Sequence, residues 1–238
     1  MKFLIHKINS LINKIIDRSS YRNISTTYLL RKKIHNFCIE RIFDDKALHF
    51  STLEEYWKFC VRFPQEKKKM NLEFGVGAGS SGNILAGTIP KEKIWGFDSF
   101  NGFYEISESS LWYKVNKTFN KVKPAMRNNY EIIEGYIENT LEDFVKKNNI
   151  NTYDAFFIHA DLDIYEPTKK VLQTFLKYKK KTYIMFDQLL NYEEFEQHEW
   201  KAFYEEVICK NIDFKIIAFT DKSNDDWGNF TKVFIEIY

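Results

Sequence analysis

The stretch that decides the fold reads Leu-Glu-Phe-Gly-Val-Gly-Ala-Gly-Ser-Ser-Gly and occupies residues 72–82. An acidic residue, Glu73, stands at the end of an apolar run, and glycine then recurs at every second position. Glycine allows a tight turn and lets a ligand approach the backbone closely. The residues that follow, Asn-Ile-Leu-Ala at 83–86, can open a helix whose free N–H groups face a bound molecule. The stretch therefore predicts a strand, a ligand-binding loop and a helix, in that order.

Outward from this loop, strand-like and helix-like segments alternate along the chain. Five apolar runs are expected to form strands, at residues 70–76, 93–100, 130–135, 153–161 and 181–187. Helices are expected at 138–147, from about Pro167, and at 193–210. Strands joined by connections of helix length predict a parallel, doubly wound α/β sheet. The last two runs, 214–219 and 232–237, have no helix between them, so we expect an antiparallel hairpin.

The first part of the chain carries no chemical motif. Residues 1–65 are expected to form an N-terminal helical extension, in which residues 51–54 resemble a capping box, and residues 66–238 the ligand-binding domain. Apolar residues recur at helical spacing within residues 1–16. The simpler interpretation is a helix that packs on the domain or on a partner subunit, which would give a homo-oligomer. The alternative is a basic amphipathic helix on a membrane surface.

Composition excludes several classes of function. The 35 Lys and Arg residues nearly balance the 33 Asp and Glu residues, so a nucleic-acid partner is not expected. Three widely spaced cysteines, Cys38, Cys60 and Cys209, fit neither a disulfide framework nor a zinc site and suit a reducing compartment. No run approaches the roughly 18 apolar residues of a membrane span. We therefore expect a cytoplasmic protein without a transmembrane segment.

The glycine loop alone does not identify its ligand. Residues 77–82 fit the pattern G-x-G-x-x-G, which is a weak signal by itself. A dinucleotide site needs an acidic residue about 20 positions further on, whereas Asp98 lies 16 positions after Gly82. Glu73 can organise the loop or meet a cationic ligand, and Asp98 ends a strand where a carboxylate can accept ribose hydroxyls. These two residues favour S-adenosylmethionine (SAM) over NAD or a purely structural turn. The expected cofactor contacts are Glu73, Gly75, Gly77, Gly79, Ser80, Asp98 and Ser99.

Acidic and amide side chains close the next two strands. Asp161 follows the fourth strand, and Asp187 and Gln188 follow the fifth. Ligands of open α/β sheets bind outside the carboxyl ends of the strands, and neighbouring strands lie about 4.8 Å apart. The three side chains could therefore hold Mg²⁺, which would orient a substrate hydroxyl and lower its pKa. Alternatively, Asp161 acts as a general base without metal, or these acids cap helices, while Asp163 holds the turn into the next helix.

Two histidines are further candidates. His198 follows the fifth strand closely enough to reach the site as a base or substrate contact, although a lone helical histidine is more often structural. His159 lies two residues before Asp161 and therefore points to the same face of its strand. It is a candidate for a contact to the cofactor or to a site residue.

Four segments together resemble the macrocin O-methyltransferase family. They read Glu-Phe-Gly-Val-Gly at 73–77, Gly-Phe-Asp-Ser-Phe-Asn-Gly at 96–102, His-Ala-Asp-Leu-Asp-Ile-Tyr-Glu-Pro-Thr at 159–168 and Phe-Asp-Gln at 186–188. The resemblance implies a Rossmann-like class I methyltransferase with a seven-stranded, mostly parallel sheet. It also implies a metal site, for which the matching positions here are Asp161, Asp187 and Gln188, with an amide in place of the last carboxylate. The family's C-terminal catalytic histidine has no counterpart here, which leaves Asp161, the metal or His198 to promote deprotonation.

The resemblance implies an SAM-dependent O-methyltransferase that acts on a sugar hydroxyl, with Mg²⁺ as a second cofactor. The acceptor would belong to a surface polysaccharide, a nucleotide sugar or a natural product. Three alternatives remain open: a nucleotide-sugar transferase with Asp161-Leu162-Asp163 as its metal motif, an NAD-dependent enzyme, and a non-catalytic subunit with the methyltransferase fold.

Overall fold

The computed structural model describes residues 26–104, 112–113, 122–192, 194–221 and 231–238. Its contacts divide the chain into two units, residues 1–37 and 38–238. The described part of the first unit is the beginning of helix α2 (Thr26–Asp44), which continues into the second unit. The helix expected within residues 1–16 lies outside the described residues.

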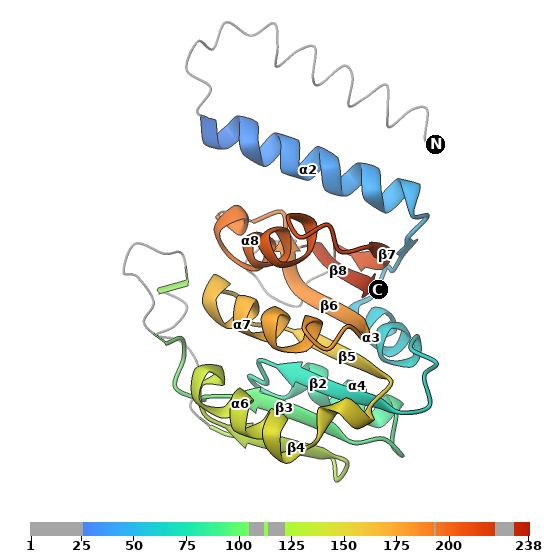
Figure 1. Cartoon of the computed structure of the whole chain (residues 1–238), viewed down its shortest axis with the longest axis vertical. Helices are drawn as coiled ribbons and strands as arrows, with labels where there is room; N and C mark the ends of the chain where they lie inside the picture. Colours follow the sequence, from blue (N-terminus) through green and yellow to red (C-terminus); the bar gives the residue numbers. More distant parts are fainter. Residues whose placement is uncertain (1–25, 105–111, 114–121, 193, 222–230) are drawn as a thin grey trace, which may run out of the picture. The chain divides into compact units, whose positions relative to one another are not determined.

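The second unit is built on one twisted sheet with the strand order β1-β7-β8-β6-β5-β2-β3-β4 (Figure 1). Only β8 runs antiparallel to its neighbours, β6 and β7, and the other described pairs are parallel. The expected fold, a mostly parallel Rossmann-like sheet with an antiparallel C-terminal hairpin, is confirmed. The strands are β1 (Leu48–His49), β2 (Lys69–Phe74), β3 (Ile94–Asp98), β4 (Tyr130–Glu134), β5 (Ala155–Ala160), β6 (Lys181–Leu190), β7 (Phe214–Thr220) and β8 (Thr231–Ile237). The two-residue β1, which we did not expect, extends the edge beyond β7.

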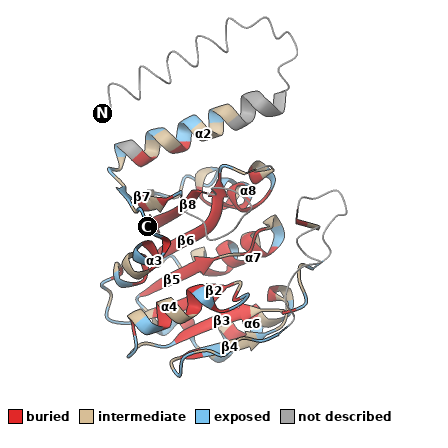
Figure 2. Cartoon of the chain, turned by 180° about the vertical axis from the view of Figure 1, so that it is seen from behind, coloured by how far each residue is buried: buried red, intermediate tan, exposed pale blue. Residues whose placement is uncertain are grey.

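Helices cover both faces of the sheet, and aromatic side chains show which helix covers which face. On one face, α6 (Ile137–Lys147), α7 (Tyr165–Leu176) and α8 (Glu199–Phe203) pack on the strands. Three ring pairs mark these contacts: Phe97–Phe144, Phe156–Phe175 and Phe186–Phe203. On the other face, α3 (Leu53–Arg62) and α4 (Ser80–Thr88) share a core with strand residues such as Phe157, Met185 and Phe234. The strands β2, β3, β5, β6 and β8 between these layers are almost entirely buried, whereas the edge strands β1 and β4 are more exposed (Figure 2).

Helix α3 belongs to this core, although it lies within the region expected to be an extension. Tyr56, Cys60 and Val61 are fully buried in it. The helix begins after Thr52, whose hydroxyl accepts the N–H of Glu55 at 3.3 Å and donates to its carboxylate at 2.7 Å. The cap is therefore one residue later than the capping box predicted at 51–54.

The helix predicted over 193–210 is wrong as a continuous element. A 3₁₀ turn (Phe195–Gln197), the short α8 and a π turn (Tyr204–Ile208) occupy the segment instead. Glu194 has φ 69°, and His198 has φ −114° and ψ −125°, and neither conformation fits an α-helix. By contrast, α7 contains Pro167 in its first turn, as expected.

None of the helices in the described ranges combines the length and apolar character needed to cross a membrane. All three cysteines are free thiols; Cys38 and Cys60 are buried and Cys209 is exposed.

Candidate functional site

The glycine loop turns sharply at the carboxyl end of β2. Gly75 and Gly77 have φ values of +91° and +51°, a region that favours glycine. Gly75 also lies directly against the next acidic loop, because a Cβ on it would fall 1.8 Å from the carbonyl oxygen of Asp161. Around Gly77 the space is open, with no heavy atom within 4 Å of the corresponding position. The loop thus packs on Asp161 at one glycine and offers bare backbone at the other.

Asp98, at the end of β3, determines the shape of this loop. Its Oδ2 accepts the N–H groups of Val76 and Gly77 at 2.9 and 2.8 Å, and its Oδ1 accepts the N–H of Phe100 at 2.7 Å. The next residue, Ser99, donates its hydroxyl to the carbonyl of Gly102 at 2.9 Å. Three backbone donors therefore fix the carboxylate at the carboxyl edge of the sheet.

A pocket opens at this edge and brings together residues from four separate segments. Gly75, Gly77, Asp98, Ser99 and Asp161 all line it. Tyr104 and Tyr136 also line it and pack edge to face, with ring centroids 5.2 Å apart. Five of the candidate residues thus share one pocket, with an aromatic wall beside them.

Glu73 lies below the loop, fully buried, and joins four elements. Its Oε1 accepts the hydroxyl of Ser81 at 2.6 Å and lies 2.8 Å from Nδ1 of His159, and its Oε2 accepts the hydroxyl of Tyr130. These partners come from α4, β4 and β5. Of the two roles expected for Glu73, the structure gives it the organisation of the loop rather than a place in the lining of the pocket.

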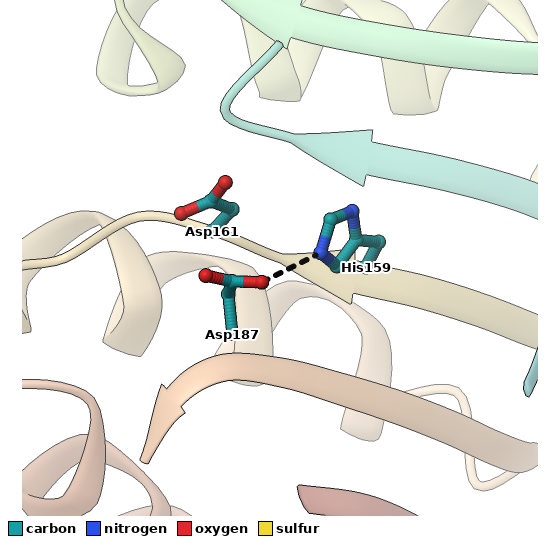
Figure 3. Close-up of side chains that lie close together, drawn as sticks. All are labelled: His159, Asp161 and Asp187. Atoms are coloured by element: carbon teal, nitrogen blue, oxygen red, sulfur yellow. Dashed lines mark ion pairs between the residues drawn. The ribbon is translucent and has the colours of Figure 1, made fainter. Parts of the chain in front are cut away.

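Three side chains converge just beyond the carboxyl end of β5 (Figure 3). Ala160, the last residue of β5, pairs with Phe186, so Asp161 directly after β5 lies beside Asp187, which is still within β6. One ligand atom from each of His159, Asp161 and Asp187 lies within 4.8 Å of the others. His159 Nε2 is 3.7 Å from Asp187 Oδ1, and its Nδ1 faces Glu73. His159 therefore contacts site residues, and among the described residues it is not part of the pocket lining.

Burial and charge shift the pKa values of all three groups. Burial opposes protonation of His159, but the negative charges of Asp187 and Glu73, together with the hydrogen bond to Glu73, outweigh it and raise its pKa to about 10. Burial and the charges of Asp187 and Asp163 raise the pKa of Asp161 well above its ordinary value. The pKa of Asp187 is lowered despite its burial, because Lys232 and His159 stabilise its charge. Asp161, which keeps partial exposure to the pocket, is thus the acid most able to take up a proton.

A buried lysine completes the cluster. The ammonium of Lys232, on β8, lies 2.6 Å from Asp187 Oδ2 and donates to the Asp187 carbonyl at 3.0 Å. The Lys232 side chain is 3% exposed. Its charge therefore lies inside the protein, against the residue predicted to hold a metal.

The cluster does not fit a divalent ion as it is arranged. Asp187 presents one oxygen to Lys232 and the other to His159. A histidine ligand must be neutral, yet both ring nitrogens of His159 face carboxylates that favour the imidazolium. Only Asp161 of the three groups then remains to attract a cation. The residues present therefore do not fit the expected Mg²⁺ in this arrangement.

Gln188, the third predicted metal ligand, is buried and outside the described lining of the pocket. Its backbone N–H donates to Glu199 Oε2 at 3.3 Å, and the N–H of Leu162 donates to Glu199 Oε1 at 3.1 Å. Glu199 is fully buried, which raises its pKa to about 7. One carboxyl group therefore ties the loop that carries Asp161 to the part of β6 that carries Asp187.

The remaining predicted residues lie elsewhere. His198 is buried beside Trp112 and Tyr192, with Nε2 3.5 Å from Glu194, and burial lowers its pKa. These contacts support the structural interpretation of His198 over a role as base. Gly79 precedes α4 with φ 79°, and Ser80 is exposed at the first position of that helix. Within the described structure, neither Gly79 nor Ser80 lines the pocket.

Sequence reasoning missed Lys232 and Glu199. Lys232 lies in the predicted last strand, and Glu199 lies next to His198 in the helix predicted over 193–210. For Lys232 the signal was a single charged residue next to the apolar run Val-Phe-Ile. Charged side chains are almost never fully buried unless they are paired.

No protein-family model matches the sequence, and no curated protein is similar to it. Among solved structures, the chain is similar to a TDP-rhamnose 3′-O-methyltransferase of calicheamicin biosynthesis. The two share 16% identity over 96% of this chain and 92% of the other, with a TM-score of 0.47. It is also similar to a precorrin-6y C5,15-methyltransferase from Geobacter metallireducens, with 12% identity over 82% and 95% of the two chains and a TM-score of 0.44. At such identities the likeness concerns the fold, so the function is argued from this chain's own residues.

Proposed function

We propose that the protein is an SAM-dependent methyltransferase that methylates a hydroxyl group. One observation carries this proposal. A single pocket joins the bare backbone of the glycine loop, the Asp98 carboxylate and the partly exposed Asp161. The first two suit an adenosine-containing cofactor, and the third suits proton removal from an acceptor.

The pocket residues fit SAM in charge and shape. The open space at Gly77 lets a ligand lie against the loop without meeting a side chain. A carboxylate has about four acceptor sites, and Asp98 uses three of them on backbone N–H groups. It keeps capacity for a ribose hydroxyl. Asp161 and Asp163 also line the pocket, so a cationic sulfonium meets negative charge there.

When bound, SAM supplies a methyl group on a sulfonium that is already a good leaving group. The chain must therefore position the acceptor and remove its proton. Asp161 is the group that we assign to proton removal. It reaches the pocket, and its raised pKa brings its basicity closer to neutral pH than that of an ordinary carboxylate. Glu199 keeps the Asp161 loop in place through the N–H of Leu162.

The acceptor is proposed to be a sugar-containing small molecule. The resemblance to the macrocin O-methyltransferase family suggests this class. The Tyr104–Tyr136 wall supports it, because aromatic rings beside carboxylates suit a ring with apolar faces and hydroxyl edges. Tyr104 is 47% exposed and therefore available to a ligand.

Calorimetry with SAM, NAD and a set of nucleotide sugars tests this proposal. SAM should bind, and Asp98→Ala should weaken its binding about tenfold or more, because the loop loses the acceptor of its N–H groups. Glu134→Ala is the matched control. Glu134 pairs with Asp98 on the neighbouring strand β4, but its carboxylate is exposed and paired with Lys123. Binding of NAD or of a nucleotide sugar without SAM binding would replace the proposal with the corresponding alternative.

A further inference from the structure

Lys232 is placed where a metal ion would be expected. Its ammonium contacts both the side chain and the backbone carbonyl of Asp187, at 2.6 and 3.0 Å. Asp187 is in turn part of the group with His159 and Asp161 that could hold a cation. A positive charge belonging to the chain therefore already lies at this cluster.

The pairing of β6 and β8 is irregular where Lys232 contacts Asp187. In the antiparallel pair of β6 and β8, Phe186 faces Val233 and Leu190 faces Thr231. The three residues between Phe186 and Leu190 thus lie opposite Lys232 alone, which is an irregularity of the β-bulge kind. Such a bulge interrupts the ladder, and here the Asp187 carbonyl accepts the Lys232 ammonium.

The ion pair between Lys232 and Asp187 is buried, so breaking it is unfavourable. The side chains of Lys232 and Asp187 are 3% and 9% exposed. Removing one partner of a buried pair leaves an uncompensated charge in the interior, so each charge holds the other in place. An incoming divalent ion would have to displace the ammonium or share the one carboxylate with it. Two cations a few ångströms apart repel each other strongly where burial keeps solvent from screening their charges.

We propose that Lys232 is the resident cation of this site and takes the place of a divalent metal ion at Asp187. Asp187 is then a positioning residue that holds Lys232 and His159 beside Asp161. Methyl transfer, if it follows the proposed function, proceeds without added metal. The charge at this position is fixed by folding and does not depend on metal supply.

Binding of Mn²⁺, followed by its electron paramagnetic resonance signal, tests this inference without SAM or acceptor. The full chain should show no Mn²⁺ binding that depends on Asp187. Lys232→Met removes the charge but keeps much of the volume, and it should gain Mn²⁺ binding at Asp187 that is about ten- to hundredfold tighter than any Mn²⁺ binding of the wild-type chain. Lys69→Met is the matched control, because that side chain is 8% exposed and paired with Glu92 at 2.9 Å. It should leave Mn²⁺ binding unchanged.

The gained binding must depend on Asp187, so the double variant Lys232→Met/Asp187→Asn should lose it. This double variant removes both charges of the Lys232–Asp187 pair, so neither of them is left unpaired in the interior. If Lys232→Met does not fold, Mn²⁺ binding by the wild type still tests the inference. Wild-type Mn²⁺ binding that Asp187→Asn abolishes would overturn the inference. A folded Lys232→Met variant that gains no Mn²⁺ binding would also overturn it. Neither outcome bears on whether SAM binds, so the proposed function stands or fails separately.

Discussion

Gly75→Ala tests the contact between the glycine loop and the Asp161 loop. The new methyl group would have to occupy a point 1.8 Å from the carbonyl oxygen of Asp161, which is backbone and cannot rotate away. The residue would also carry a side chain at φ +91°. A side chain in a left-handed conformation costs about 1–2 kcal/mol. Overpacking adds about 1–3 kcal/mol, so the free energy of unfolding should fall by about 2–5 kcal/mol in total.

Gly77→Ala separates the two contributions. Gly77 also has positive φ, at +51°, but no heavy atom lies within 4 Å of its Cβ position. Only the conformational contribution, about 1–2 kcal/mol, is expected there. Urea unfolding of both variants should therefore place Gly75→Ala below Gly77→Ala by about 1–3 kcal/mol. In thermal melts, each kcal/mol corresponds to about 2–4 °C for a chain of this size. Equal losses in the two variants would refute the close approach of the two loops.

Two further variants probe the charged cluster and the base. The pKa of His159 is raised from 6.5 to about 10 in the folded state, because Asp187 and Glu73 together outweigh the opposing effect of burial. Its protonation therefore stabilises the fold fully below pH 6.5, and this contribution is lost as the pH rises to about 10, so urea unfolding should show stability falling across that window. His159→Gln should flatten this fall, and an unchanged pH profile would contradict the assigned charge. Asp161→Asn should lower kcat by about 10²- to 10⁴-fold in a methyl-transfer assay while SAM affinity stays near the wild-type value. A kcat within a few fold of wild type would assign proton removal to another group.

The sequence was sufficient to predict the frame of the fold. Apolar runs joined by connections of helix length were enough to predict the parallel core of the sheet. The absence of a helix between 214–219 and 232–237 was enough to predict the antiparallel strands at its C-terminal end. The proximity of Asp161 and Asp187 was predictable, because each comes one residue after a directly paired position, Ala160 in β5 and Phe186 in β6, although β6 continues to Leu190 beyond its predicted end at 187. The two-residue period of a strand was enough to predict that the side chains of His159 and Asp161 point to the same face.

Long-range pairing of side chains was not predictable from one sequence. Lys232 donates to Asp187, which lies 45 positions away in the chain. The contact occurs at an irregularity in the pairing of β6 and β8 that no local sequence pattern predicts. The sequence placed Asp98 at a strand end as an acceptor for ribose hydroxyls, but it did not reveal that the carboxylate also accepts the N–H groups of Val76 and Gly77 from the neighbouring loop. The helix predicted over 193–210 is interrupted at Glu194 and His198, whose non-helical backbone conformations no residue pattern in the sequence indicated.

Transfer of a methyl group from SAM to a hydroxyl can be measured in one assay. The full chain is incubated with methyl-labelled SAM and a panel of sugar-containing acceptors, and S-adenosylhomocysteine and labelled product are measured together. We expect equal amounts of the two with at least one acceptor, in the presence of a chelator. SAM that binds but is never converted with any acceptor would refute methyl transfer in this pocket and leave a non-catalytic subunit with this fold.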